Sequence, residues 1–559
     1  LADGGHIRVD GSIQANSTGK DDKGLPQAGG DIYIGRDKDT NVLAAVGDVR
    51  GAQLESKGGF VETSGTHLKT DGISVSAKDW LLDPSDITIS NSASSNVTGT
   101  SPDDITPNGG AGTSSIVQVS TIQSAINTGT NVTIKTTNAL NSTGAGNITI
   151  ANALSFNNTG EQDATLSLIA DNGIIQNAAI TATGSRLVHI SMTANGQFQG
   201  NTAAHANSRG VAINAGITTN GNITLTGNNQ SGAAHGTGAG VYTNNATVDA
   251  GTTGDVTIIG TATNGSGVLI DDRTIIKGRD ITLTGTANAS TSGTGMRFNF
   301  NTGSPSLQLE AFRNLNITGT LNASGTATGS GVQVVSTCCA GVGAGLFMTT
   351  STGQVNITGI QTDNANNTSS AVYLTGLKLN ASGDVSIQAQ AASSNSLAIH
   401  MQRGGGTLNG NTDGVQMRVR SNNGNVLIQS NQGAVLGQDA GAVLISGRNV
   451  TLDNTGAGMT ASMSVGGVSK GSIDNTTGAI VLGAGTSTFS TSVTNWWGEN
   501  WMPLGVSLRG ASGLGNSTDG VTATGNLTIG GSSSAAQGVV VGSGMTVRGN
   551  TVSYTHLRA

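Results

Sequence analysis

Three of the four tryptophans in the chain lie within one hexapeptide, Trp496-Trp497-Gly498-Glu499-Asn500-Trp501. An exposed indole offers a large, rigid apolar surface that loses little conformational entropy when it stacks on a sugar ring or an aliphatic ligand. Trp496, Trp497 and Trp501 are therefore candidate surface-binding residues for a carbohydrate or a receptor. The alternative interpretation is an insertion loop whose indoles pack onto the core.

Patterns that would indicate catalysis or metal binding are weak. Residues 467–471 match the letters of a nucleophile elbow, but Gly and Ser are so abundant that such a match is expected by chance. The seven histidines are scattered, and no two have metal-ligand spacing. The acidic pairs at 21–22, 103–104 and 271–272 could bind calcium, yet none lies in the Gly-rich nonapeptide of a calcium-binding β-roll, and solvated turns explain them equally. We expect no catalytic residue, cofactor or metal, and hence no enzyme.

A degenerate strand phrase, Gly-[Asn/Asp]-[Ile/Val]-Thr-[Ile/Leu], recurs along the chain. In one copy Ile223 and Leu225 alternate with Thr224, which is the pattern of a half-buried strand. The Gly and Asn or Asp before each strand provide the backbone freedom that a sharp corner needs. Such short strands bury a core only when many of them stack. The phrase and its relatives occupy residues 146–150, 221–225, 254–258, 279–283, 314–318, 354–358, 383–387, 424–428, 448–452 and 525–529.

A second phrase, with Gly or Ala before an apolar alternation, follows the first at an irregular distance. The offset is short between Val256 and Val268 and longer between Val355 and Val372. Constant strands with variable spacing predict an all-β fold, a β-solenoid with loop insertions and roughly 20 to 25 residues per coil. Copies of the second phrase occupy residues 240–242, 267–270, 295–298, 331–334 and 371–374.

Composition limits the possible partners. Only 11% of the 559 residues are charged, against about 25% in a typical domain. The net charge of −7 is spread thinly and no basic stripe exists, so we expect no nucleic acid partner. No apolar run approaches the length of a membrane span, roughly 18 residues, so we expect no transmembrane helix. The adjacent cysteines Cys338 and Cys339 are either two small side chains in a coil or a reactive or disulfide-bonded pair.

The residue patterns along the chain divide it into four parts. Residues 1–90 are a β-helical block, 91–140 a connection of loop, short helix and strand, and 141–551 a repetitive solenoid. Residues 552–559 lack the recurring phrases, and we interpret them as a non-native tail and exclude them from the fold prediction. Because the chain begins inside a strand pattern, we expect it to be a fragment of a longer protein.

The connection holds the one predicted helix. Ser120 or Thr121 would cap it, Ile122 and Ile126 lie one turn apart, and Gly129 would end it. A strand over residues 131–134 is predicted to follow.

The first third of the chain resembles a known family. The string Gly58-Gly59-Phe60-Val61-Glu62-Thr63-Ser64-Gly65 and the later Ala77-Lys78-Asp79-Trp80-Leu81-Leu82-Asp83-Pro84 resemble a signature of large two-partner-secretion exoproteins, the filamentous-haemagglutinin-like and high-molecular-weight adhesin-like proteins. Motifs at 29–35, 120–134 and 163–173 are similar to the same pattern. The resemblance covers residues 29–180 and implies a right-handed parallel β-helix. Phe60 and Trp80 are interpreted as packing groups, with ligand recognition as the alternative.

The resemblance implies a secreted bacterial adhesin on the cell outer surface of a Gram-negative organism, a repeat rod for cell adhesion and virulence. Its implied partners are an outer-membrane two-partner-secretion transporter and a receptor or glycan of a host or neighbouring cell. Two alternatives remain open. One is the stalk of a contact-dependent growth-inhibition toxin, which shares the solenoid. The other is a β-helical polysaccharide-degrading enzyme, which would need acidic side chains and an Arg converging in one groove.

Overall fold

The chain divides into two compact units, each described by itself. Unit 1 is Leu1–Ser231 with Val241–Thr257, and unit 2 is Gly232–Gly240 with Ile258–Ala559. The boundaries expected at residues 90, 140 and 551 stay predictions. The computed structural model describes residues 5–24, 27–37, 40, 42–94, 97–98, 106–107, 114–136, 146–196, 209–230, 238–300, 307–324, 327–336, 345–362, 370–392, 398–402, 417–431, 434–436 and 443–454, and beyond these the backbone of the strands named below.

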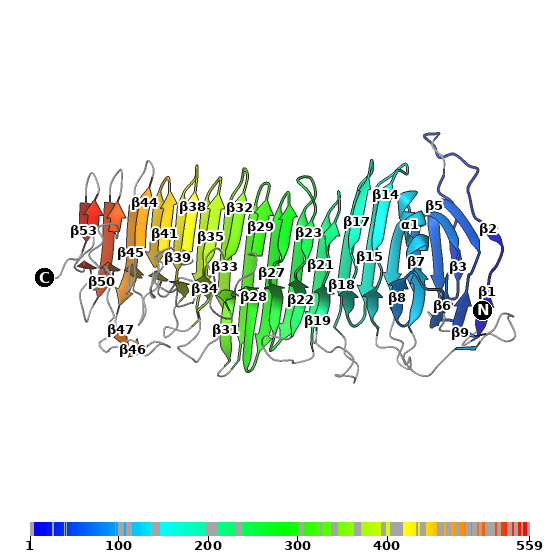
Figure 1. Cartoon of the computed structure of the whole chain (residues 1–559), viewed down its shortest axis with the longest axis horizontal. Coiled ribbons are helices and arrows are strands. Elements are labelled where there is room, and N and C mark those ends of the chain that lie inside the picture. The colour runs from blue at the N-terminus through cyan, green and yellow to red at the C-terminus, as the bar shows by residue number, and fades with distance from the viewer. Residues whose placement is uncertain are drawn as a thin grey trace. The chain divides into compact units, whose positions relative to one another are not determined.

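Each coil of unit 2 passes through three parallel sheets in the order I, II, III, and the coils stack side by side (Figure 1). Sheet I of unit 2 contains β25 (Ser266–Asp271), β28 (Ser292–Phe300), β31 (Thr328–Ser336), β34 (Val372–Thr375), β37 (Ile399–Gln402), β40 (Ala434–Leu436), β43 (Met463–Val465), β48 (Val506–Leu508) and β51 (Val539–Val541). Sheet II contains β26 (Ile275–Gly278), β29 (Leu307–Ala311), β32 (Leu346–Thr350), β35 (Leu377–Ala381), β38 (Met417–Ser421), β41 (Val443–Gly447), β44 (Gly471–Asn475), β49 (Gly520–Thr522) and β52 (Thr546–Arg548). Sheet III contains β27 (Ile281–Ala289), β30 (Leu315–Ala323), β33 (Val355–Gln361), β36 (Val385–Gln390), β39 (Val426–Ser430), β42 (Val450–Asn454), β45 (Ile480–Ser487), β50 (Leu527–Ser533) and β53 (Val552–Thr555), and β46 (Val493–Thr494) pairs with β47 (Asn500–Trp501) outside the three sheets.

Unit 1, taken by itself, also contains strands of the sheet types labelled I, II and III, and its sheet II begins later in the chain than its sheets I and III. Sheet I contains β1 (His6–Arg8), β4 (Val46–Asp48), β6 (His67–Lys69), β8 (Ile87–Ser90), β11 (Ser115–Gln118), β13 (Ile148–Ile150), β16 (Ile174–Gln176) and β19 (Arg209–Ile213). Sheet II contains β14 (Leu154–Asn158), β17 (Ile180–Gly184), β20 (Ile217–Thr218) and β23 (Thr247–Asp249). Sheet III contains β2 (Ser12–Gln14), β3 (Ile32–Ile34), β5 (Gln53–Ser64), β7 (Ser74–Asp83), β12 (Asn131–Lys135), β15 (Ala164–Ala170), β18 (Val188–Ala194) and β21 (Ile223–Asn229); the remaining elements are α1 (Val119–Asn127), the antiparallel pair β9 (Val97–Thr98) and β10 (Thr106–Pro107), and β22 (Ala239–Asn244) and β24 (Val256–Thr263), which contain unit boundaries.

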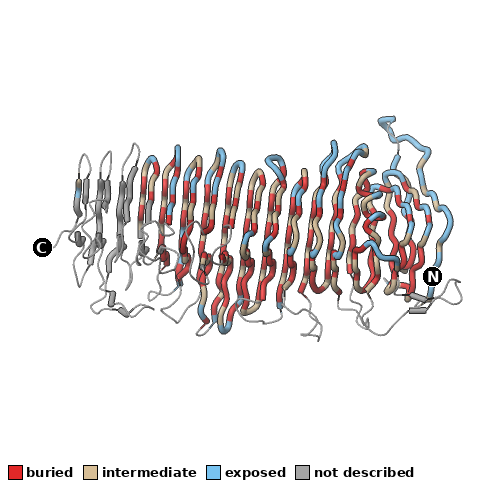
Figure 2. The backbone as a smooth tube through the Cα atoms, in the orientation of Figure 1, coloured by how far each residue is buried: buried red, intermediate tan, exposed pale blue. Residues whose placement is uncertain are grey.

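Columns of apolar side chains form the core of unit 2. Alternation in β27 buries Ile281 and Leu283 and leaves Thr282 half-buried on the other face. Parallel pairing stacks equivalent residues at the strand spacing of about 4.8 Å, so the alternation repeats as stripes of burial in Figure 2. Two adjacent columns of sheet III, all at most 1% exposed, consist of Ile281, Leu315, Val355, Val385, Val426 and Val450, and of Leu283, Ile317, Ile357, Ile387, Ile428 and Leu452.

These columns confirm the predicted parallel β-solenoid, with corrections in detail. Ile281 pairs with Leu315 and Val426 with Val450, so the first of these two coils is clearly longer than the second. The expected length of roughly 20 to 25 residues per coil suits the second coil and is too short for the first, because both coils pass through three strands and the first has longer connections between them. The sequence analysis predicted two strands per coil and not the third, in sheet II, because the corners of that strand carry no recurring phrase.

The two strand phrases separate by sheet, with one exception. The described copies of the second phrase lie in sheet I and those of the first phrase in sheet III, except residues 146–150, whose strand β13 pairs with β8 and β16 in sheet I. A corner followed by apolar alternation suits a strand of either sheet, so the phrase alone does not specify which. The exclusion of residues 552–559 from the fold was wrong for β53, which continues sheet III beside β50; whether the tail is native stays a prediction.

Helix α1 covers the beginning of sheet II. It buries Val119, Ile122 and Ile126, and the side-chain amide of Gln123 donates a hydrogen bond of 2.6 Å to the carbonyl oxygen of Ser155 in β14. A helix over an edge strand protects unpaired backbone groups from pairing with another chain. The described residues contain this one helix, as predicted.

The predicted end of α1 is confirmed and the predicted start is wrong. Gly129 follows the helix with φ +91°, a conformation that favours glycine. The N-cap is Gln118, which makes no side-chain capping bond, and Thr121 lies inside the helix, 6% exposed. Burial of the apolar face sets the start here, because tertiary packing outweighs a local cap.

Strand order departs from chain order where α1 is introduced. In sheet I, β11 pairs with β8 through Ser115 and Ile87 and with β6 through Ile116 and Lys69. Strand β8 also pairs with β13. The chain therefore places β8 first and then returns to insert β11 between β6 and β8.

A line of glycines brings sheets III and I of unit 2 into backbone contact. A Cβ atom added at Gly285 would overlap the carbonyl oxygen of Gly295, and one added at Gly319 would overlap that of Gly331. Beyond this contact the strands continue and enclose a small second apolar cluster. Its members are Ala287, Ala289, Leu321, Ala323 and Ala327.

Replacement of Gly319 by Ala should destabilise the protein by about 2–3 kcal/mol, because the new methyl group meets rigid backbone and forces the two sheets apart. Gly11→Ala is the matched control, since nothing lies within 4 Å of the added Cβ atom, and it should change stability by less than about 0.5 kcal/mol. Denaturant unfolding followed by circular dichroism measures both. Equal effects of the two substitutions would contradict the close approach at Gly319.

Candidate binding surface

The residues that carry the family resemblance in unit 1 pack against one another. Gly58, with φ +71°, forms a bulge where the register of β5 against β7 shifts between Ser56 and Phe60. A Cβ atom at Gly59 would lie 2.6 Å from the carbonyl oxygen of Gly29. The glycine pairs of the two motifs therefore allow two backbone segments to approach closely.

A buried ionic network joins the same motifs. The Arg36 guanidinium bridges the carboxylates of Glu62 and Asp83, whose side chains are 4% and 0% exposed. Ser64 also donates a 2.7 Å hydrogen bond to Glu62. The network ties the β3 corner to β5 and β7, so its role is structural and it presents no open site.

Trp80 is a core residue, as predicted. It is 1% exposed, stacks in register with Val132 of β12, and its indole N–H donates a 3.0 Å hydrogen bond to Thr63 Oγ1. Phe60 is half-buried, with its ring centroid 5.6 Å from that of Tyr33. Both residues act in packing, and Trp80 offers no surface for recognition.

The outer face of sheet I in unit 2 is polar yet largely withdrawn from solvent. A column opposite the core contains Leu269, Arg297, Gln333, Tyr373 and His400, of which Leu269 and His400 are each 2% exposed. The rings of Tyr373 and His400 meet edge to face with centroids 5.1 Å apart. Burial lowers the pKa of His400 to about 3.

Arg297 is the one cation within this column, and the polysaccharide-degrading alternative would need acidic side chains close to such an Arg. Burial lowers its pKa, and the charge of Asp271 opposes that change. Asn299 donates a 2.9 Å hydrogen bond to Asp271. Asp271 therefore faces Arg297 as a carboxylate whose charge acts on it, and the polysaccharide-degrading alternative stays a prediction that this column does not test.

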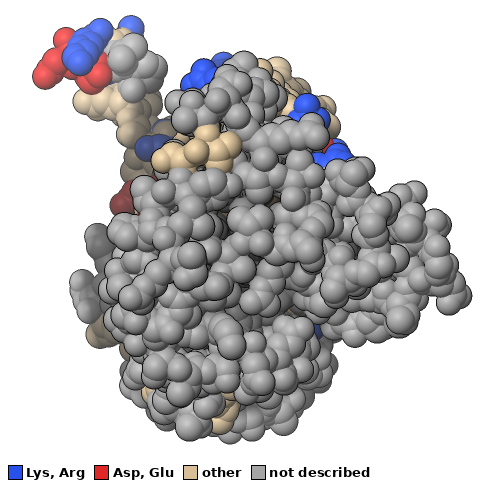
Figure 3. Space-filling model, turned by 90° about the vertical axis from the view of Figure 1, so that its left-hand side faces the viewer, with Lys and Arg blue, Asp and Glu red and all other residues tan. Residues whose placement is uncertain are grey.

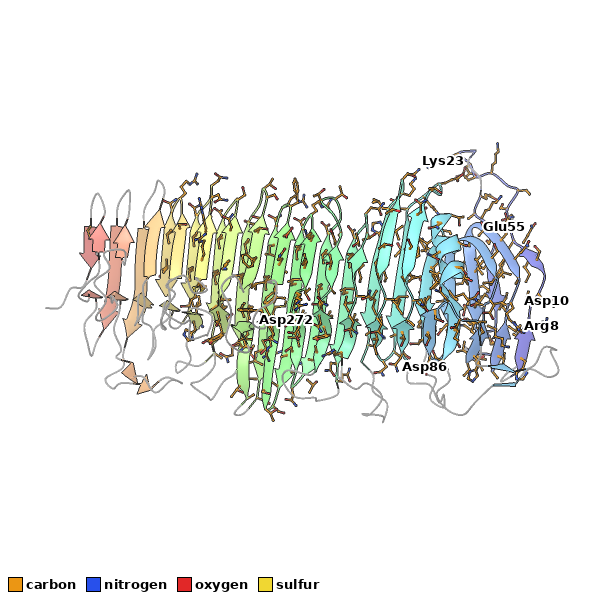
Figure 4. All side chains as sticks on the ribbon, in the orientation of Figure 1. Arg8, Asp10, Lys23, Glu55, Asp86 and Asp272 are labelled. Atoms are coloured by element: carbon orange, nitrogen blue, oxygen red, sulfur yellow. The ribbon has the colours of Figure 1, made fainter. Side chains whose placement is uncertain are left out.

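The acidic pairs do not form a metal site in the described part of the chain. No group of three or more His, Cys, Asp or Glu side chains there could hold a metal ion. The Asp272 backbone N–H donates to Asp271 Oδ1 at 3.0 Å, which is a turn contact, and Asp272 is labelled in Figure 4. Residues 103–104 lie outside the described residues, as do residues 467–470 of the nucleophile-elbow match and Cys338 and Cys339.

The outer face of sheet II in unit 2 presents an accessible group of cations. Lys378 of β35 lies directly opposite Arg418 of β38, and Asn380 lies opposite Arg420. Arg418 and Arg420 are exposed and Lys378 is half-buried, with its ammonium 4.6 Å from the ring centroid of Phe347. We call Lys378, Arg418 and Arg420 the basic patch.

The tryptophan candidates are not tested by this structure. Trp496 and Trp497 lie outside the described residues, and for Trp501 only the backbone is described, in β47. The basic patch, in contrast, was missed. Its sequence signal is Arg418-Val419-Arg420, in which strand alternation places the two Arg side chains on the same face. Its proximity to Lys378, on the preceding coil, depends on the register of two coils separated by loops.

No family model matches the chain, and a search of curated proteins finds no significant match. No helix among the described residues has the length and apolarity to cross a membrane. The resemblance of residues 29–180 to the exoproteins therefore rests on the motifs themselves.

Substitution Arg36→Gln should destabilise the protein by about 3–5 kcal/mol, because it leaves two buried carboxylates without a compensating charge. Lys57→Gln is the control, since Lys57 is 75% exposed and pairs with Glu55 at 3.3 Å; it should cost at most about 1 kcal/mol. Thermal unfolding of both variants at pH 7 measures the difference. A loss at Arg36 as small as that at Lys57 would mean that the network does not stabilise unit 1.

Burial of His400 should make the free energy of unfolding depend on pH. Its pKa is about 3 in the folded state and about 6.5 when unfolded, so below pH 6.5 the unfolded chain binds a proton that the folded chain excludes. Stability should fall as the pH drops from 6.5 towards 3, by up to about 1.4 kcal/mol per pH unit.

The variant His400→Phe, which preserves a ring beside Tyr373, should lose this component. Urea unfolding at pH 7, 5 and 4 measures it, with His6→Phe, at an exposed position, as the control. Parallel pH profiles for the His400→Phe variant and the original chain would show that burial of His400 does not control the acid response.

Proposed function

We propose that this chain is part of a secreted bacterial surface exoprotein that acts as an adhesin. In this proposal, the stacked coils form a scaffold on the cell outer surface of a Gram-negative organism, and its outer faces contact a receptor or glycan of a host or neighbouring cell. The proposal is supported by the motif resemblance over residues 29–180 and by the arrangement of the three sheets.

The observation that carries the proposal is the combination of constant register and variable connections. In sheet III of unit 2, equivalent residues pair over successive coils although the coils differ in length, as the short step from Val426 to Val450 and the long step from Val385 to Val426 illustrate. Such a scaffold accepts different insertions without losing its core, because each coil contacts chiefly its neighbours. Extended faces of this kind suit binding that is spread over many weak contacts.

Stacked coils also suit the proposed export partner, an outer-membrane two-partner-secretion transporter. In a solenoid, folding can begin at one coil and propagate to the next. A chain that emerges progressively from a transporter can therefore fold as it appears, without waiting for distant segments.

The full chain, purified and fluorescently labelled, should bind saturably to epithelial or bacterial cells in flow cytometry, whereas the heat-unfolded chain should not. Incubated with a panel of polysaccharides, it should generate no new reducing ends, since a scaffold binds glycans without cleaving them. Absence of binding to every cell type tested, or release of sugar from any polysaccharide, would refute the adhesin proposal.

A further inference from the structure

The outer face of sheet III in unit 2 carries threonines in a two-dimensional arrangement. In-register pairing stacks Thr284 of β27, Thr318 of β30 and Thr358 of β33 in one column, and it places Thr286 opposite Thr320 in the next column. These side chains are half-buried on the outer face, whereas the alternate residues of the same strands are buried on the inner face. We call Thr284, Thr286, Thr318, Thr320 and Thr358 the threonine array.

The hydroxyl groups of the threonine array are available to a ligand. Along its two margins, asparagine side chains bond to one another between coils: Asn356 donates to Asn316 and Asn322 donates to Asn288, each at 2.9 Å. The array lies between these two ladders, and within the described part of the chain no hydrogen bond uses its hydroxyl groups. The margins therefore satisfy their polar groups internally and the array does not.

The array repeats at fixed distances in two directions. Neighbouring strands lie about 4.8 Å apart, and alternate residues of one strand lie about 6.6 Å apart. Thr is branched at Cβ, which restricts its χ1 rotamers, so residues in register present hydroxyl and methyl groups as one regular lattice. Both distances are close to repeats between oxygen atoms on the prism faces of hexagonal ice. A surface that is already ordered loses little conformational entropy when it binds an ordered layer.

This face lacks the groups that other classes of ligand need. None of the residues of β27, β30 and β33 is charged or aromatic, whereas protein interfaces are enriched in aromatic residues and Arg and nucleic acid sites are basic. The basic patch lies on sheet II instead. Figure 3 shows Lys and Arg groups at the upper edge of the molecule, where β35 and β38 carry their labels in Figure 1. An uncharged lattice of hydroxyl groups is complementary to ordered water.

We propose that the threonine array binds ice. Its hydroxyl groups take the places of water oxygens in the outermost layer of the crystal, and its methyl groups fill the spaces between them. Bound chains stop the growth of that layer locally, so the ice surface curves between them and the freezing point falls below the melting point. The inference goes beyond the proposed adhesin function, because it requires no receptor and is tested without cells.

Slow growth of ice from a solution of the fluorescently labelled full chain tests the proposal. The original chain should be enriched in the ice relative to the remaining liquid. It should also facet single ice crystals and separate their freezing point from their melting point. Serum albumin, carried through the same procedure, measures non-specific trapping and should stay in the liquid.

The double variant Thr284→Gln, Thr318→Gln should be excluded from ice as albumin is, because two long amide side chains interrupt the lattice at its centre. Gln388 of β36 already stands in this column beside Thr358, so the strand accepts the substitution. Thr349→Gln is the matched control, at an exposed position of β32 in sheet II. This control variant should enter ice as the original chain does.

Exclusion of the original chain from ice would overturn the proposal, and so would equal enrichment of the double variant. Another possible occupant of an uncharged, regular face is a second copy of this chain. Dimers that sedimentation detects in the original chain and not in the double variant would assign the face to that copy and overturn the proposal as well. Unaltered circular dichroism and thermal unfolding of the variants exclude misfolding as the cause of a loss.

Discussion

The in-register stacking of apolar residues from one coil onto the next is the interaction on which the rest of the structure depends. A strand as short as β36 cannot bury a core by itself. Its Val385 and Ile387 become fully buried because equivalent residues lie above and below them. Parallel pairing supplies the backbone hydrogen bonds and the side-chain register together, so the corners and connections are left to vary.

The departures from simple stacking occur where the stack must begin or change its cross-section. Helix α1 covers the first strand of sheet II, and the return of β11 between β6 and β8 inserts an extra strand before sheet II begins. In unit 2, the glycine contacts at Gly285 and Gly319 bring two sheets together and close the main core on one side. Each departure occurs where the stack begins or where two sheets approach, and a uniform repeat of identical coils would not require it.

The three outer faces of unit 2 differ in chemistry although their inner faces are alike. Sheet III presents uncharged Thr and Asn residues in ladders, and Asn356 donates a 2.9 Å hydrogen bond to Asn316 of the preceding coil. This bond gives the repeated Asn a structural role. Sheet I carries polar groups that are withdrawn from solvent, such as His400. Among the described residues of unit 2, sheet II alone exposes a concentrated charge.

The sequence was enough to predict the fold class, because short strands that alternate Ile, Val and Leu with Thr and Asn after glycine corners bury their apolar face only when many of them stack. It also placed Trp80 in the core and ended α1 at Gly129, because these depend on local preference and hydrophobicity. Three features depend on packing between coils and could not be predicted from the sequence: the sheet that each strand joins, the start of α1, and the charges that become neighbours. Residues 146–150 and 221–225 share one phrase and lie in different sheets, because strand pairing follows the register of whole coils. Lys378 and Arg418 meet for the same reason: loops of unpredictable length separate them in the chain, and stacking alone brings them together.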